Sequence, residues 1–303
     1  MERYRGLVSD SMRWQGFELR PGDIILSTPP KCGTTWMQMI LALLILGEPE
    51  LRVPLSKLSP WLDKQDRARR DVVADLEAQT HRRFIKTHTP LDGLPADDRV
   101  TYVCIGRDPR DVAMSMDNHM DNLDIEAFLV AREAAAKRDG IELEPVLAPR
   151  PRSDDPLERF WAWVDNDTPP TQINSSLLRT LRHLESFFNA PSGLDVVLLR
   201  YEDLKRDLDT SMRGLAERLQ IAVRPDVWPQ LIAAASFEAM RGNAAMTVPG
   251  AGVDHWKDNE RFFNRGTSGQ WRELLDDRDL TRYWSRARAI GPGDVIDWIH
   301  EGS

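Results

Sequence analysis

A lysine, a glycine and two threonines stand close together in the stretch from Asp23 to Leu46, which reads D-I-I-L-S-T-P-P-K-C-G-T-T-W-M-Q-M-I-L-A-L-L-I-L. Lys31 supplies an ammonium, Thr34 and Thr35 supply hydroxyls, and Gly33 allows a tight turn. A helix that begins here would add unpaired backbone N–H groups and the positive end of its dipole. Such a combination binds phosphate or sulfate, whereas the alternative is a buried turn that carries a surface lysine.

The order of these residues differs from the Walker A pattern of ATP-binding loops, G-x-x-x-x-G-K-[ST]. Here the lysine precedes the glycine, and no earlier glycine opens the loop. The segment therefore predicts an anion-binding loop and argues against an ATPase loop.

Apolar runs of strand length alternate with longer, helix-like segments along the chain. The runs on either side of the Lys31 loop predict a strand, a loop and a helix in succession. Further strands are expected within 82–90, 100–107 and 194–200, and further helices at 124–137, 156–164, 175–188, 209–219, 225–240 and, as the terminal helix, 280–290. This alternation predicts right-handed crossovers and hence an α/β fold with a central parallel sheet flanked by helices. No internal repeat or linker divides the chain, so a single domain over residues 1–303 is expected.

Two segments fit neither pattern. Residues 142–155 contain three prolines and several charges, and we expect an exposed insertion there. Residues 242–269 are glycine-rich, polar and aperiodic, and a structureless loop of this length is usually functional or disordered. We expect this second segment to close over a bound ligand.

Polar side chains follow two of the expected strands. Lys86, Thr87 and His88 end one strand, and Arg107 ends the next, with Ser115 two turns into the helix that follows. In an open parallel sheet, ligands bind at the edge formed by the carboxyl ends of the strands. Each residue also has a structural explanation, because His88 could cap a turn and Arg107 could pair with a nearby aspartate.

Composition narrows the range of partners. The chain has 303 residues, 41% hydrophobic and 29% charged, with a formal net charge of -8. This charge opposes general binding to nucleic acid, so no nucleic-acid partner is expected. The longest apolar stretch, Met39 to Leu46, is far shorter than the roughly 20 residues of a membrane span. With no signal-peptide pattern, and with Cys32 and Cys104 as the only cysteines, a cytoplasmic protein is expected.

Taken together, these motifs resemble the soluble, cytosolic-type sulfotransferases that use 3'-phosphoadenosine 5'-phosphosulfate (PAPS). The family's 5'-phosphosulfate loop, P-K-x-G-T-T-W, is present at 30–36, with Cys32 where many relatives have serine. Its K-T-H-x-P segment is found at 86–90, and its 3'-phosphate motif R-[ND]-P-x-D-x-x-x-S at 107–115. The resemblance covers nearly the whole chain.

Three further motifs carry the resemblance towards the carboxyl terminus. Tyr201 in Y-E-D-L matches the family's adenine-side tyrosine. Ser236 and Phe237 resemble the family's pair whose aromatic ring stacks on adenine, although Ala235 replaces the threonine that usually precedes this pair. The family's R-K-G-x-x-G-x-W corresponds to N-R-G-T-S-G-Q-W at 264–271. Asn264 thus replaces an arginine that would contact the 3'-phosphate.

The resemblance implies a P-loop-like sulfotransferase fold and an enzyme that moves a sulfuryl group from PAPS to a hydroxyl of a small-molecule or glycolipid acceptor, without a metal. It implies that His88 is the base, that Lys31 stabilises the leaving group, and that Ser115 restrains Lys31 until the acceptor binds. The residues implied in donor binding are Lys31, Cys32, Gly33, Thr34, Thr35, Trp36, Arg107, Ser115, Tyr201, Phe237, Asn264, Arg265 and Gly266.

Two other classes of protein remain as alternatives. Glu202 and Asp203 follow the fourth expected strand and could act as a Walker B acid, as in a nucleotide kinase or NTPase. An inactive nucleotide-binding protein is the other, although the presence of Lys31 and His88 argues against it.

The acceptor and the oligomeric state are less constrained by the sequence. We expect the acceptor pocket to include Trp14, Phe17, Trp61 and residues of 120–163, but these lie outside the motifs, so the acceptor stays open. The family's self-association motif K-x-x-x-T-V-x-x-x-E is not reproduced at 272–281, which predicts a monomer or a weak dimer.

Overall fold

A four-stranded parallel sheet forms the centre of the computed structural model, which describes residues 1–143, 152–249 and 255–301. The strands are β1 (Ile24–Ser27), β2 (Phe84–Thr87), β3 (Thr101–Gly106) and β4 (Asp195–Arg200), in the order β2-β1-β3-β4. All three pairings are parallel, which confirms the predicted sheet. The chain passes from β1 to its neighbour β2 on one side, and then from β2 to β3 on the other side of β1. At such a reversal of strand order, a crevice is expected beyond the carboxyl ends of β1 and β3.

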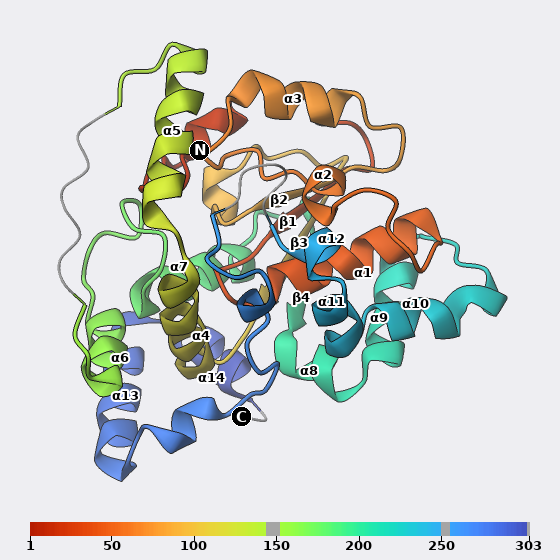
Figure 1. Ribbon diagram of the computed structural model, residues 1–303. Coiled ribbons are helices and arrows are strands. Elements are labelled where there is room, and N and C mark those ends of the chain that lie inside the picture. The colour runs from red at the N-terminus through yellow and green to blue at the C-terminus, as the bar shows by residue number, and fades with distance from the viewer. Residues whose placement is uncertain (144–151, 250–254, 302–303) are drawn as a thin grey trace.

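Helices cover both faces of this sheet (Figure 1). The α-helices are α1 (Thr34–Leu46), α2 (Leu55–Leu58), α3 (Arg69–Glu77), α4 (Pro109–Asn122), α5 (Ile125–Asp139), α6 (Pro156–Val164), α7 (Leu177–Phe188), α8 (Tyr201–Arg206), α9 (Leu208–Arg218), α10 (Trp228–Ala234), α11 (Phe237–Gly242), α12 (Ala244–Thr247), α13 (Asp277–Ile290) and α14 (Gly293–His300). Short 3-10 helices lie at η1 (Ser11–Trp14), η2 (Leu91–Gly93), η3 (Pro225–Val227), η4 (Glu260–Phe262) and η5 (Gln270–Glu273).

Two hydrophobic cores form because successive strand residues point to opposite faces of the sheet. Ile25 and Tyr102 lie in one core with buried residues of α6, α7, α13 and α14. Ile24 and Val103 lie in the other, with α1, α9 and α10. A sheet buried on both faces explains why the strands read as continuous apolar runs.

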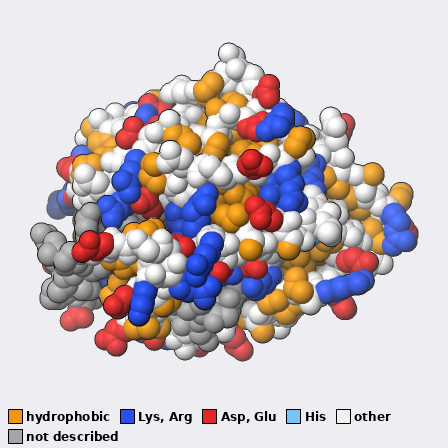
Figure 2. All heavy atoms as spheres, turned by 90° about the horizontal axis from the view of Figure 1, so that it is seen from above, with side chains coloured by type: hydrophobic (Ala, Val, Ile, Leu, Met, Phe, Trp, Pro, Cys, Tyr) orange, Lys and Arg blue, Asp and Glu red, His pale blue; other side chains and the backbone are white. Residues whose placement is uncertain are grey.

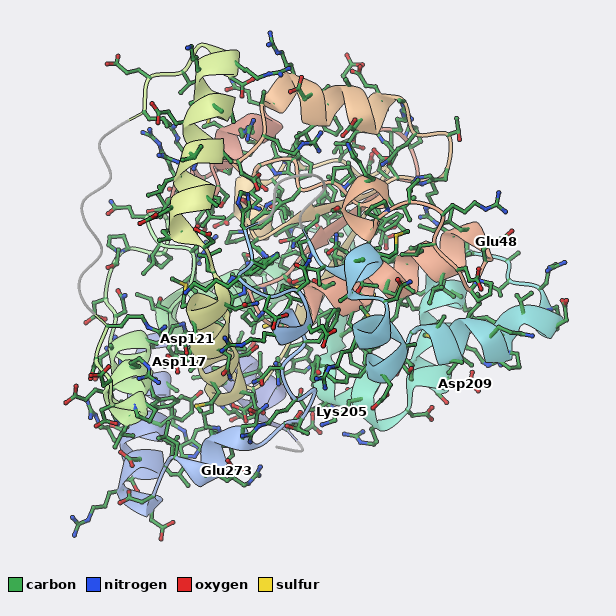
Figure 3. All side chains as sticks on the ribbon, in the orientation of Figure 1. Glu48, Asp117, Asp121, Lys205, Asp209 and Glu273 are labelled. Atoms are coloured by element: carbon green, nitrogen blue, oxygen red, sulfur yellow. The ribbon has the colours of Figure 1, made fainter. Side chains whose placement is uncertain are left out.

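The polar surface ties helices together as well. Asp117 on α4 accepts a hydrogen bond from the Arg159 Nε of α6 at 2.8 Å, and Figure 3 shows Asp117 on the side of α4 that faces α6. Figure 2 shows basic and acidic side chains interspersed over one whole face of the molecule. Within the described residues, no helix is long and apolar enough to cross a membrane.

Three expectations about helices were wrong. The helix expected at 225–240 is broken, because Ser236 is extended and its Oγ accepts from the Ala239 N–H at 3.2 Å, which starts α11 as a new helix. The segment 242–269 contains the short helices α12 and η4 among its described residues. The helix at 280–290 is not the terminal one, since α14 follows and buries Val295, Ile296 and Ile299. The expected insertion at 142–155 lies mostly outside the described residues.

Candidate active site

The loop between β1 and α1 has the shape of an anion-binding site. Lys31 (φ 68°) and Gly33 (φ 94°) both adopt left-handed backbone conformations, which cost energy in a lysine and persist mainly at functional sites. Only glycine fits at position 33, because a Cβ there would lie 2.9 Å from the Tyr201 ring. Gly33 is also the N-cap of α1 and has no side chain to occupy the first N–H groups of that helix. These N–H groups therefore remain available to an anion.

Arg107 follows β3 and connects the loop after β1 with the loop before η5. Its Nη1 donates to the Lys31 carbonyl and its Nη2 to the Thr267 carbonyl, each at 3.2 Å. Its guanidinium lies 4.4 Å from the centre of the Tyr201 ring. Its Nε is buried and has no hydrogen-bond partner among the described residues. The side chain thus joins two loops and keeps one donor for a ligand.

Aromatic residues expected near an adenine come together beside Arg107. The Trp36 and Tyr201 ring centres are 5.3 Å apart, and the Trp36 Nε1 donates to the Ala235 carbonyl at 2.8 Å. Phe237 packs so closely on Gly266 that a Cβ there would lie 2.7 Å from its ring. Residues from α1, α8, α11 and the loop before η5 therefore meet in one place.

Not every expected donor-binding residue reaches this place. The Arg265 side chain is 61% exposed and pairs with Glu273 of η5, which Figure 3 labels, at 3.4 Å. Asn264 is exposed. Burial raises the pKa of the Cys32 thiol to about 12, so that the thiol is protonated at neutral pH. The Thr34 hydroxyl is buried and bonded to the Thr28 hydroxyl at 2.5 Å.

The His88 imidazole is fixed in one tautomer at the end of β2. Its Nδ1 lies 2.7 Å from the Thr28 carbonyl, which can only accept, so Nδ1 carries the proton. The lone pair is then on Nε2. Burial, followed by the positive charge of Lys86, lowers the pKa of His88 well below 6.5. The geometry and the pKa together favour a neutral imidazole that can accept a proton through Nε2.

Three side chains surround the His88 turn, and sequence reasoning assigned only one of them, Trp61, to the site. Asp63 is fully buried, and its Oδ2 accepts from the hydroxyls of Thr87 at 2.7 Å and of Thr89 at 2.6 Å, the residues on either side of His88. The Arg179 Nη2 donates to the His88 carbonyl at 2.9 Å. Trp61 meets the imidazole edge to face, with ring centres 4.6 Å apart. These contacts hold the imidazole in one orientation.

The Lys31 ammonium contacts a second histidine. Its Nζ lies 3.3 Å from the His119 Nδ1 and 4.9 Å from the centre of the Phe262 ring. Burial, followed by the charge of Arg107, lowers the pKa of Lys31 to about 8. Within the described residues, His119 and not Ser115 is at hydrogen-bonding distance from this ammonium. The position of His119 could have been predicted from the sequence, because His119 stands one helical turn after Ser115 and so lies on the same face of α4.

A pocket opens beside β2, where Lys86 and Trp61 form part of its lining. Its lining residues are Gln38, Leu55, Ser56, Ser59, Trp61, Lys64, Asp66, Arg67, Lys86, Thr247 and Pro249. Trp61 was expected there and does line the pocket. Trp14 and Phe17 were expected there too, but they are buried in the core and pack on each other with ring centres 6.0 Å apart.

The described residues offer no group of three or more His, Cys, Asp or Glu side chains that could hold a metal ion. Asp203 pairs with Arg200 at 2.7 Å and with Arg206 at 2.9 Å. Burial raises the pKa of Glu202 to about 7, so about half of this carboxyl is protonated at pH 7. Neither acid is therefore placed as a Walker B ligand of Mg²⁺ would be.

A parallel sheet with helices on both faces, and with the Lys31 loop and Arg107 at its switch point, defines the chain as an α/β protein. The family model for a sulfotransferase domain matches residues 21–286. A glycolipid sulfotransferase of Mycobacterium bovis is 39% identical over 307 residues, which cover 99% of this chain and 94% of that protein. The chain therefore belongs to the sulfotransferase family and is a transferase.

More distant relatives agree with this assignment. Sulfotransferase 1B1 of the dog is 26% identical over 275 residues, which cover 86% of this chain and 80% of that one. The crystal structure of a mouse sulfotransferase, SULT7A1, complexed with PAP superimposes with a TM-score of 0.66 at 21% identity, covering 96% of this chain and 92% of that chain. At this level of identity, the structural match shows the fold.

Proposed function

We propose that this enzyme transfers the sulfuryl group of PAPS to a hydroxyl of a small-molecule or glycolipid acceptor. One observation carries the proposal, which is what stands at the carboxyl ends of β1, β2 and β3. Lys31 lies in the loop before α1, and Arg107 donates to its carbonyl and keeps an Nε without a partner among the described residues. His88, held by the Thr28 carbonyl, has its lone pair on Nε2. The mouse sulfotransferase complexed with PAP and the mycobacterial glycolipid sulfotransferase support this choice of donor and acceptor.

The donor would lie between the α1 loop and Arg107. The 5'-phosphosulfate would take the open N–H groups of α1 and the Lys31 ammonium, since both favour an anion. The 3'-phosphate would take the free Nε of Arg107, with Ser115 and Arg265 as further contacts. Arg265 must then leave Glu273, a pair exposed enough to exchange easily. The adenine would lie among Trp36, Tyr201 and Phe237.

The acceptor hydroxyl would lose its proton to His88 as it attacks sulfur. A bond forms between the hydroxyl oxygen and sulfur, the bond between sulfur and the bridging phosphate oxygen breaks, and the Nε2 takes the proton. Negative charge then grows on the bridging oxygen, where Lys31 and the loop N–H groups stabilise it more than in the ground state. No residue need form a covalent intermediate, and none of these steps uses a metal ion.

The remaining expectations stand as parts of the same proposal. We take residues 1–303 as one sulfotransferase domain of a cytoplasmic enzyme that is a monomer or a weak dimer. Asp276, which stands in the region of the missing self-association motif, caps α13 by accepting from the Arg278 and Asp279 N–H groups at 2.8 and 2.9 Å. Capping of α13 is thus a structural reason for an aspartate at position 276.

Transfer of radiolabelled sulfate from PAPS to a panel of hydroxyl compounds tests the proposed function. We expect labelled sulfate esters, with adenosine 3',5'-bisphosphate (PAP) as the second product and with no need for added Mg²⁺. A purified, folded enzyme that binds neither PAPS nor PAP would contradict the proposal, as would tighter binding of ATP with Mg²⁺ than of PAP.

Arg107→Ala is expected to weaken the binding of PAP by about ten- to a hundredfold, because one charge-assisted hydrogen bond is lost. AMP, which lacks the 3'-phosphate, should bind nearly as before. Calorimetric titration of both nucleotides measures the difference. Arg278→Ala, which removes an exposed arginine of α13, serves as the control. Equal losses for PAP and AMP would show that Arg107 does not recognise the 3'-phosphate.

Asp63→Ala is expected to lower kcat roughly ten- to a hundredfold with little change in the KM for PAPS, because a misplaced base costs rate rather than donor binding. Thr89→Val should have a smaller effect of the same kind. If Asp63 acts through the threonines, the effects of the two substitutions should not add in the double variant. Thermal unfolding of each variant separates a loss of rate from a loss of fold. Additive effects, or a raised KM at unchanged kcat, would show that Asp63 does not position His88.

A further inference from the structure

The pocket beside β2 shares two walls with the proposed reaction centre. Lys86 and His88 are two residues apart at the end of a strand, so their side chains leave the sheet on the same face. Trp61 contacts the His88 ring and also lines the pocket. A molecule in this pocket would therefore lie against Trp61, the residue that also contacts the base.

The pocket's lining combines hydrogen-bonding groups with apolar surface. Gln38, Ser56, Ser59, Lys64, Asp66, Arg67, Lys86 and Thr247 carry polar side-chain groups, Trp61 adds an indole N–H beside its apolar ring, and Leu55 and Pro249 are apolar. A steroid, which has few polar groups, would cover these groups without pairing them, and each buried group left unpaired costs free energy. The lining thus favours an acceptor that has both apolar surface and several hydrogen-bonding groups.

Two buried groups in this lining lack partners among the described residues. The Ser59 side chain is 1% exposed, and its hydroxyl makes no hydrogen bond. Lys86 is 5% exposed, and its ammonium lies 4.6 Å from the centre of the Trp61 ring, with no hydrogen-bond or ion-pair partner within those residues. Oxygen atoms of a bound molecule would satisfy both groups.

A carboxylate stands in the same lining as a fixed acceptor. Asp66 forms an ion pair with Lys64, and it lies 2.9 Å from the His255 Nε2. Burial opposes its ionisation, but Lys64 and His255 outweigh this and hold the pKa of Asp66 at about 2. The carboxylate is therefore charged and would repel an anionic acceptor, whereas it can accept from a hydroxyl.

We propose that this pocket binds a sugar ring of the acceptor, with Ser59 and Asp66 as specificity-determining residues. A sugar fits because each of its hydroxyls both donates and accepts, and the pocket offers an ammonium, a carboxylate, an amide and a hydroxyl. The inference rests on the proposed function, since the sugar hydroxyl would receive the sulfuryl group. The ring could belong to a free sugar or to the headgroup of a glycolipid.

The test compares acceptors with and without a sugar. Methyl and octyl β-glucosides and β-galactosides provide sugar rings without and with a lipid-like chain, and 1-octanol and 2-naphthol provide hydroxyls alone. We expect a higher kcat/KM for at least one glycoside than for 1-octanol or 2-naphthol. Preference for the octyl over the methyl glycoside would identify a glycolipid headgroup, and equal use of the two would identify a free sugar.

Two variants test whether Ser59 and Asp66 recognise the sugar ring. Ser59→Ala should lower kcat/KM for the preferred glycoside by about threefold to tenfold, and Asp66→Asn by about ten- to a hundredfold, with 1-octanol and 2-naphthol unaffected. Ser285→Ala, at an exposed position of α13 on another part of the molecule, is the matched control. Because Ser59 makes no hydrogen bond within the described residues, its loss should not impair folding.

The outcomes separate this inference from the proposed function. Equal losses for all acceptors in both variants, or a preference of the wild type for 1-octanol and 2-naphthol, would overturn the sugar assignment while sulfuryl transfer stands. Glycoside binding to the PAP complex, detected by tryptophan fluorescence and weakened by Asp66→Asn, would support the pocket even if no transfer occurred. If no glycoside bound to the enzyme and none was sulfated, the inference would be overturned.

Discussion

His88→Ala is expected to lower kcat by about 100-fold or more, because a positioned general base contributes a factor of this size. The affinity for PAP should hardly change, since the His88 Nδ1 is used by the Thr28 carbonyl and its Nε2 faces the acceptor in the proposed mechanism. Single-turnover transfer from labelled PAPS measures the rate, and calorimetry measures the affinity. A rate near that of the wild type would refute the assignment of the base.

The pH dependence of the rate supplies a second test of the same residue. A base works only when it is deprotonated, and burial next to Lys86 keeps the pKa of His88 well below 6.5. The rate should therefore hold as the pH falls to 6.5 and decline only in more acidic solution. His81→Ala removes a histidine that bonds to the neighbouring Arg82 carbonyl and should leave this profile unchanged. A decline centred at or above pH 6.5 would contradict the low pKa.

The parts of the site that depend on neighbours in the chain were predicted from the sequence. Gly33 stands two residues after Lys31, and Asp108 caps α4 by accepting from the Arg110 N–H at 2.9 Å, with Pro109 in the first helical turn. Such local signals fix where a strand ends and a helix begins. The parallel sheet then places the loops after β1 and β3 at the same edge.

The parts that depend on tertiary contacts were missed. Asp63 reaches Thr87 across 24 residues, and Arg179 reaches the His88 carbonyl across 91 residues. No local pattern distinguishes either residue from an ordinary charged residue. Trp14 was predicted to line the acceptor pocket but lies in the core. An aromatic side chain suits either place, and only the tertiary packing decides between them.

Lys31→Ala is expected to lower kcat by about 100-fold or more, since it removes a charge that meets the leaving oxygen in the transition state. Unlike His88→Ala, it should also weaken PAP binding, because in the proposed mechanism the same ammonium contacts the 5'-phosphate in the ground state. Lys205→Ala, which removes an exposed lysine of α8 labelled in Figure 3, is the matched control. A Lys31→Ala enzyme with the wild-type rate and PAP affinity would refute both roles.

The lowered pKa of Lys31 adds a prediction about the pH dependence of PAP binding. The free enzyme holds this pKa at about 8, and a bound anion favours the protonated ammonium, so the complex binds more protons than the free enzyme does. The affinity for PAP should therefore fall as the pH rises through about 8, and proton uptake should be visible as a difference in binding heat between two buffers. In Lys31→Ala, both effects should shrink, because the group that takes up the proton is gone. The same pH slope in the variant would mean that another group takes up the proton and that Lys31 does not meet the 5'-phosphate.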